Sequence, residues 1–101
     1  MKRYRVAPEA LSDIDQIMLY IARDSTQNAL KVWERLEDAF GRLGEYPGLG
    51  HTREDLRDDT ARVFPVYNYL IIYDSAVRPV LILRVVHGSR DLGQVELAKP
   101  A

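Results

Sequence analysis

Several basic side chains of this sequence could act on a phosphate group or bind another macromolecule. Most of these residues lie in the last third of the chain. His87 could act as a general base near neutral pH, with Arg84 shortly before it and Arg90 shortly after it. Arg62 stands on an earlier β-type segment that we expect to join the same sheet. The three arginines could converge into one small positive patch, and His87 could also contact a target.

Each of these residues also has a structural interpretation. His87 follows an apolar strand, so its ring could simply cap the end of the sheet with a hydrogen bond. Arg84 could be half-buried and paired with a carboxylate, and Asp91 and Glu96 are possible partners. Arg90 follows a predicted turn, so we expect it to be exposed and favour it for target contact.

The sequence predicts no metal site and no cofactor. His51 stands in a polar loop without a second ligand at metal-binding spacing. A nearby acidic run lacks the alternating ligands and the turn glycine of a calcium loop, so we interpret it as solvated loop charge; it comprises Glu54, Asp55, Asp58 and Asp59. Cysteine is absent, which excludes disulfides and thiolate metal sites.

The composition indicates one small globular domain spanning residues 1–101. Hydrophobic residues make up 47% of the chain, and the net charge at pH 7 is −1. Proteins that bind nucleic acid through its phosphates usually carry a positive excess, so we expect no direct nucleic-acid binding beyond a local patch. The sequence shows neither a secretion signal nor a membrane span, which predicts a cytoplasmic protein.

Two amphipathic helices are predicted in the first half, after a short β-type run at 4–7. Pro8 and Glu9 suit a first helical turn, Ser25 suits the N-cap of a second helix through about Leu43, and Gly44 suits a left-handed helix end. The apolar arcs comprise Ala10, Leu11, Ile14, Ile17, Met18, Ile21 and Ala22, then Ala29, Val32, Trp33, Leu36, Ala39, Phe40 and Leu43.

Three strands are predicted at 62–66, 69–74 and 80–86, because these segments are rich in β-branched and aromatic residues. Their short connections predict an antiparallel meander. The last segment is apolar on both faces except at Arg84, so it should lie centrally. Residues 45–61 form a long connection in which we expect a helical turn at 54–57. The fold class is therefore α+β in the order β-α-α-β-β-β, with a helical hairpin packed on a small antiparallel sheet.

Several apolar side chains lie outside the predicted core arcs. Leu19, Tyr20 and Leu30 fall off these arcs, whereas Trp33 lies on the core face of its helix. Apolar side chains exposed together on one helical hairpin indicate a partner surface.

The order of these elements and several short sequence motifs resemble those of a known protein family over nearly the whole chain. The motifs are YRVAPEA at 4–10, DI at 13–14, YIA at 20–22, LGEYPGLG at 43–50, RVFPV at 62–66, YLIIY at 69–73 and ILRVVHGSRD at 82–91. Together and in this order they resemble the RelE/ParE superfamily of toxins from type II toxin–antitoxin systems.

The resemblance implies one of two activities. RelE-like members cut messenger RNA in the ribosome without a metal, using basic residues, whereas ParE-like members lack that set and trap DNA gyrase. Close to the position where the ribonucleases carry an arginine on the strand before the last, this sequence has Leu70, which cannot stabilise a developing phosphorane charge. Arg90 stands where both branches commonly carry a basic residue.

These features favour the ParE-like branch: a non-enzymatic toxin that inhibits DNA gyrase. The resemblance implies neutralisation by a cognate antitoxin, a small DNA-binding protein whose disordered tail folds over the toxin. We expect target contacts at Arg90, His87, Arg84 and Arg62, and antitoxin contacts at Leu19, Tyr20, Leu30 and Trp33. The alternatives are a metal-independent, ribosome-dependent endoribonuclease built from the same basic residues, and a relic that only binds its antitoxin. An open cleft gathering three or more arginines or lysines would contradict the favoured reading.

Overall fold

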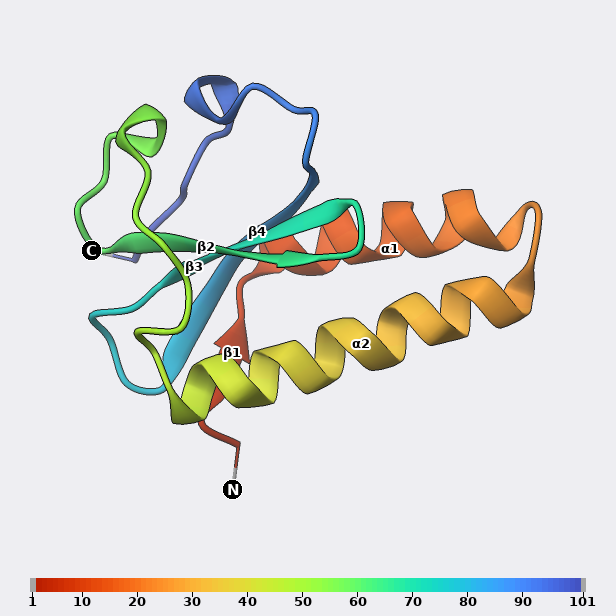
Figure 1. Cartoon of the computed structure of the whole chain (residues 1–101), viewed down its shortest axis with the longest axis horizontal. Helices are drawn as coiled ribbons and strands as arrows, with labels where there is room; N and C mark the ends of the chain where they lie inside the picture. The colour runs from red at the N-terminus through yellow and green to blue at the C-terminus, as the bar shows by residue number, and fades with distance from the viewer. Residues whose placement is uncertain (1, 101) are drawn as a thin grey trace.

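A computed structural model describes residues 2–100 of the chain. Two long helices form a hairpin that lies against one face of a four-stranded sheet (Figure 1). The elements are β1 (Tyr4–Val6), α1 (Pro8–Ala22), α2 (Thr26–Glu45), the short 3-10 helix η1 (Glu54–Leu56), β2 (Ala61–Val66), β3 (Tyr69–Asp74), β4 (Val80–His87) and a second 3-10 helix η2 (Leu92–Gln94). This arrangement confirms the predicted α+β class and order of elements.

The strand order is β1-β4-β3-β2, so β4 lies between β1 and β3 as its two apolar faces predicted. Strands β2, β3 and β4 form the predicted antiparallel meander. Strand β1 instead pairs with β4 in parallel, with Tyr4 opposite Val80 and Val6 opposite Ile82. The sheet is therefore mixed, and the expectation of a purely antiparallel sheet was wrong. The helical hairpin and the first two strands of the meander separate β1 from β4 in sequence, and β4 then runs in the same direction as β1.

The helix boundaries follow local signals at their starts. Pro8 opens α1, and the Ser25 hydroxyl accepts a hydrogen bond from Asn28 N at 3.1 Å at the start of α2. The predicted left-handed end at Gly44 was wrong, because α2 continues through it to Glu45. A Cβ at position 44 would lie 2.8 Å from the carbonyl oxygen of Arg3, so glycine allows the helix to pack closely on the chain before β1.

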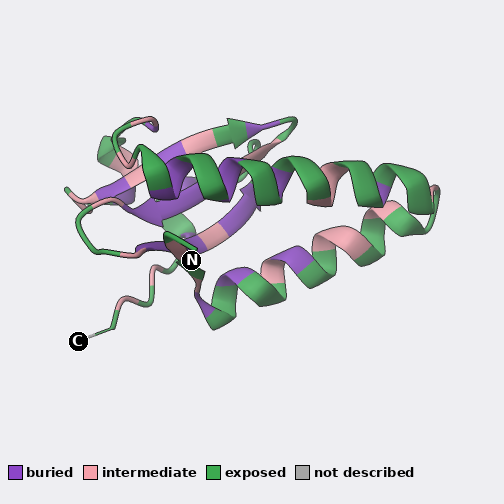
Figure 2. Ribbon diagram, turned by 90° about the horizontal axis from the view of Figure 1, so that it is seen from below, coloured by how far each residue is buried: buried purple, intermediate pink, exposed green. Residues whose placement is uncertain are grey.

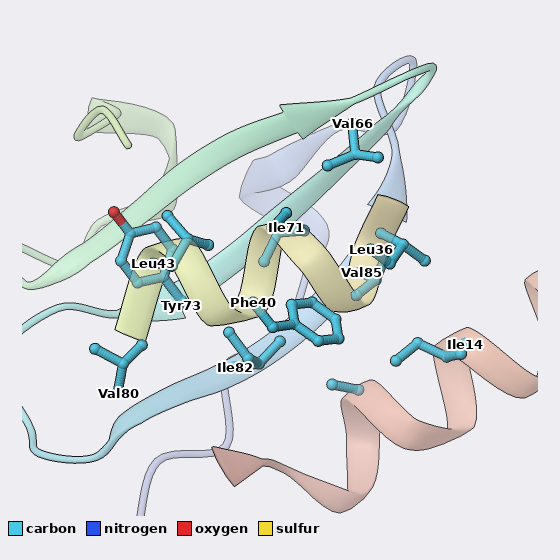
Figure 3. Packing of buried hydrophobic residues seen from close by; sticks show 12 residues of the cluster. Ile14, Leu36, Phe40, Leu43, Val66, Ile71, Tyr73, Val80, Ile82 and Val85 are labelled. Carbon is cyan, nitrogen blue, oxygen red and sulfur yellow. The ribbon is translucent and has the colours of Figure 1, made fainter. Parts of the chain in front are cut away.

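Both faces of the sheet are covered. The main core lies between the hairpin and the sheet (Figure 3), and its largest fully buried members are Leu36, Phe40, Leu43, Ile71, Tyr73, Val80, Ile82 and Val85. The opposite face is covered around η1, η2 and the C-terminal segment, where Leu56, Ala61, Val63, Ile72, Val86, Leu92 and Val95 pack together. Burial on two sides explains why β4 carries almost no polar side chain.

The joined ends of α1 and α2 extend beyond the strands (Figures 1 and 2). Leu19, Tyr20 and Leu30 are 72%, 69% and 56% exposed, which confirms that they lie outside the core. Leu11 belongs to the predicted apolar arc yet is 50% exposed, because helical spacing fixes a direction and not whether anything covers it. Within residues 2–100, no helix is long and apolar enough to cross a membrane.

Candidate functional site at the end of strand β4

An open cleft of about 640 Å³ lies where α1 faces the start of β3 and the end of β4. Helix α1 forms one wall, and the β2–β3 turn, the end of β4 and the turn after it form the other. The lining residues are Asp13, Gln16, Ile17, Tyr20, Asn68, Tyr69, Val85, Val86, His87 and Arg90. Gly88 N donates a hydrogen bond to Asn68 O at 2.7 Å, which ties the two turns of the second wall together.

The ring of His87 is exposed, and the turn that follows β4 fixes its orientation. Its Nδ1 accepts a hydrogen bond from Ser89 N at 3.1 Å and lies 2.8 Å from Ser89 Oγ. Tyr69 meets the ring edge-on, with 5.7 Å between ring centroids. Because Nδ1 acts as the acceptor, the neutral ring carries its proton on Nε2. His87 is thus arranged as a hydrogen-bond donor to a ligand, and the same contacts fit the predicted capping role.

Arg90 is the cation of this cleft that has no internal partner. It is exposed, and among residues 2–100 its guanidinium forms no hydrogen bond or ion pair. Only its backbone is anchored, because Arg90 N donates to His87 O at 3.0 Å. A guanidinium held on a tight turn and free of partners is well suited to contact another molecule.

Arg84 is not available to such a molecule. Its Nε and Nη2 donate to the two carboxylate oxygens of Asp13 at 2.7 and 3.0 Å, and its Nη1 donates to Glu96 O at 3.1 Å. The hydrogen bonds that Arg84 donates to the Asp13 carboxylate raise the pKa of Arg84 above its usual value. The prediction of a half-buried pair is confirmed, but the carboxylate belongs to Asp13, on α1, and not to Asp91 or Glu96. Asp13 also accepts from Val85 N at 3.0 Å, so it fastens α1 to β4.

Arg62 lies elsewhere. Its Nη1 donates to Gly50 O at 2.8 Å and so holds the loop that follows α2. The predicted convergence of Arg62, Arg84 and Arg90 into one patch was therefore wrong: one holds a loop, one is paired, and one is exposed in the cleft. The sequence shows which residues are basic, but the partners that occupy two of them come from distant segments.

Leu70 is less informative than the sequence indicated. Its side chain packs with the cluster on the far side of the sheet, whereas its neighbour Tyr69 packs on the hairpin side and lines the cleft. Tyr69, and not Leu70, is therefore the residue of β3 that lines the cleft.

A second hollow gathers three cations, which meets the condition stated above as contradicting a toxin that acts by binding alone, so the choice between binding and RNA cleavage is left to the experiments proposed below. Lys2, Arg3 and Arg78 line it, together with Gly44, Glu45, Pro47 and Pro79. It lies where β4 begins, whereas the first cleft lies where β4 ends, and the strand between them spans about 20 Å. These cations therefore cannot act with His87 or Arg90 on one phosphate group.

The polar residues of the loop between α2 and β2 form contacts within the protein that hold the loop in place. His51 pairs through its backbone with Val63, and its ring is exposed. Asp58 accepts hydrogen bonds from Lys99, Thr60 and Ala61, and the bond from Lys99 is the main cause that lowers the pKa of Asp58. No group of three potential metal ligands occurs among residues 2–100.

The predicted antitoxin-contact residues lie on the helical hairpin in two different environments. Leu19, Tyr20 and Leu30 are exposed, and Tyr20 also lines the cleft, whereas Trp33 is half-buried against the main core. The sequence did not single out Gln16, Asn68 and Tyr69 as cleft residues. Their types carry no distinctive chemical signal, and only the packing of α1 against β3 and β4 brings them together.

Comparisons with known proteins agree with this fold. A family model described as the ParE toxin of the type II toxin–antitoxin system, parDE, matches residues 4–92. Toxin ParE3 of Caulobacter vibrioides is 32% identical over 84 residues, covering 79% of this chain and 80% of that protein. A putative toxin, Y4kP, of Sinorhizobium fredii is 33% identical over 94 residues, covering 93% and 96%.

A solved structure is also similar. A chain of the chromosomal ParDE TA system from P. aeruginosa superimposes with a TM-score of 0.68 at 18% identity, covering 86% of this chain and 96% of that one. At this level of identity, the likeness shows the common fold.

Proposed function

This chain belongs to the ParE toxins of type II toxin–antitoxin systems, and on that premise we propose that it inhibits DNA gyrase by binding and is neutralised by a cognate antitoxin. One observation favours binding over RNA cleavage. The basic residues that a ribonuclease would need at one phosphate are apart: Arg84 is paired with Asp13, Arg62 donates to Gly50 O, and Arg90 lines the cleft with no side-chain partner among residues 2–100.

The cleft offers groups that suit a protein surface. Arg90 presents its guanidinium donors, and Nε2 of His87 presents one more. Tyr20, which the sequence assigned to the antitoxin surface, also lines the cleft and adds a large, exposed ring with a polar hydroxyl. Tyrosine and arginine are enriched among the residues that dominate protein interfaces. A gyrase surface that presents hydrogen-bond acceptors beside apolar side chains would complement these donors and the ring of Tyr20.

Gyrase inhibition is tested with purified protein. We expect the chain, incubated with gyrase and relaxed plasmid, to block supercoiling or to accumulate cleaved DNA. Supercoiling that stays intact at excess toxin contradicts the proposal. Primer extension on translated messages after induction tests the ribosome-dependent alternative, and codon-phased cuts would establish the ribonuclease in its place. Growth that is unaffected by expression of the chain would instead point to a relic.

Arg90 provides the sharpest single variant. We expect Arg90→Ala to reduce gyrase inhibition at least about tenfold, as for an interface residue worth more than about 1.4 kcal/mol. The free energy of unfolding should change by less than about 0.5 kcal/mol, because the side chain has no internal partner. Arg57→Ala, at an exposed arginine outside the cleft, is the matched control. Equal loss of inhibition, antitoxin binding and stability in Arg90→Ala would assign Arg90 a structural role.

The antitoxin is expected on the overhanging part of the helical hairpin. Leu19, near the end of α1, and Leu30, near the start of α2, are exposed, so a folding antitoxin segment could bury them. We expect Leu19→Asp and Leu30→Asp to weaken antitoxin binding while the toxin stays folded. Val77→Asp, at an exposed apolar residue of the β3–β4 connection, is the control. Unchanged antitoxin affinity in both helix variants would remove this surface from the proposal.

A further inference from the structure

Strand β1 is an edge of the sheet, and its outer side is open. Val80 N donates to Arg3 O at 3.0 Å, and Ala7 N donates to Ile82 O at 2.9 Å. Because backbone groups alternate along a strand, Arg3, Arg5 and Ala7 face β4, whereas Tyr4 and Val6 direct their N–H and C=O groups outward. Neither residue has an outward hydrogen-bond partner among residues 2–100.

Cations surround this open edge. Lys2, Arg3 and Arg5 are exposed and close together in sequence, and Arg78 lines the hollow at the start of β4 together with Lys2 and Arg3. None of the four forms an ion pair in the described part of the chain, although Nη1 of Arg78 donates to Ser75 O and Val77 O at 2.8 and 2.9 Å, which fixes its position and leaves its charge uncompensated. Of the residues that the structure describes, Glu45 is the only carboxylate that lines the hollow. A chain with a net charge of −1 therefore carries a locally positive end.

From the open edge and the cations together, we propose that β1 docks an extended acidic peptide segment of a partner, which adds a strand to the sheet and places its carboxylates among Lys2, Arg3, Arg5 and Arg78. Backbone pairing supplies a sequence-independent part of the recognition, and charge supplies the selectivity. A second copy of this chain is a poor occupant, because it would bring the same cations opposite one another.

This inference goes beyond the proposed toxin activity, because it involves neither gyrase nor the helical hairpin. Its test uses a fluorescein-labelled peptide of alternating glutamate and valine with the chain alone. We expect saturable binding by fluorescence anisotropy, at least tenfold weaker for the same peptide N-methylated at every second residue. A lysine-for-glutamate version should not bind. Equal affinity for the unmodified and N-methylated peptides would overturn strand addition.

Amide hydrogen exchange locates the binding. Saturation with the peptide should slow exchange at Tyr4 and Val6, whose N–H groups face outward, and leave Arg5 unchanged because it already faces β4. Unchanged exchange at both outward amides contradicts the proposal. The double variant Lys2→Glu with Arg3→Glu should bind at least tenfold more weakly, whereas Arg23→Glu with Lys31→Glu, at exposed cations of the hairpin, should bind normally.

Duplex DNA is the competing ligand for a cationic end. The same assay is repeated with a 20-base-pair DNA duplex, about two helical turns long, as competitor. If the duplex displaces the acidic peptide and binds the Lys2→Glu, Arg3→Glu variant more weakly, these cations bind a phosphate backbone and the proposal is overturned. Failure of the duplex to compete supports the peptide.

Discussion

The two edges of the sheet handle their outward backbone groups in opposite ways. On β2, Val63 exchanges hydrogen bonds with His51 at 2.8 and 2.9 Å, so Ala61, Val63 and Pro65 face outward. Ala61 N donates to Asp58 Oδ1 at 3.1 Å, and Pro65 has no N–H to donate. Every outward donor position of β2 is thus satisfied or absent, whereas those of Tyr4 and Val6 on β1 are open.

Exposed strand edges promote unwanted pairing, and proteins commonly block them. Here the β2 edge is blocked by the loop at His51, the carboxylate of Asp58 and the missing N–H of Pro65. The β1 edge is protected only by being short and by the positive charges around it. Positive charge repels a second copy but attracts an acidic chain. The comparison therefore indicates that β2 offers no free N–H to an added strand, whereas β1 offers those of Tyr4 and Val6.

The largest expected effect comes from proline substitutions that separate the two sides of β1. Arg5→Pro removes an N–H that faces β4 and leaves a carbonyl of β4 unsatisfied, so it should cost about 3 kcal/mol of unfolding free energy. Val6→Pro removes an outward N–H and keeps the ladder, so it should cost about 2 kcal/mol less. Urea denaturation of the two variants measures this difference. Equal losses would mean that the alternation along β1 is not as described.

A smaller effect should open the protected edge. Tyr73 Oη donates to Pro47 O at 2.6 Å and accepts from Gly50 N at 2.8 Å, and so holds the loop that places His51 against β2. Tyr73→Phe leaves both loop groups unsatisfied and should cost about 2 kcal/mol. The Val63 amide should exchange faster, because its partner His51 loosens. Tyr46→Phe, at an exposed tyrosine, is the control. If the exchange rate of the Val63 amide stays unchanged, the loop held by Tyr73 does not protect the β2 edge.

The smallest effect concerns pH. Asp58 has a pKa below its usual 3.8, chiefly because of the hydrogen bond from Lys99. Its folded pKa is lower than its unfolded pKa, so its contribution is complete above 3.8 and is lost as the pH falls through the folded value. Asp58→Asn should destabilise the protein by less than about 1 kcal/mol at pH 6, with a smaller difference near pH 3. Asp59→Asn is the exposed control. A difference that does not change with pH would contradict this assignment.

Much of the candidate site could be predicted as residues but not as an arrangement. The sequence indicated that Arg90 is exposed, that Arg84 has a carboxylate partner, and that Leu19, Tyr20 and Leu30 lie off the core. It did not identify Asp13 as that partner, because Asp13 is separated from Arg84 by most of the chain. The predicted convergence with Arg62 failed for the same reason: its position depends on a loop that follows another helix.

The sequence by itself determined the features that depend on neighbours along the chain. Apolar periodicity specified both helices, Ser25 specified the start of α2, and two apolar faces placed β4 in the centre of the sheet. Tertiary structure alone decided the parallel pairing of β1, the partner of Arg84 and the contrast between open and closed edges. Local patterns record which face of an element is buried, whereas the choice of a distant partner depends on how all the elements pack together.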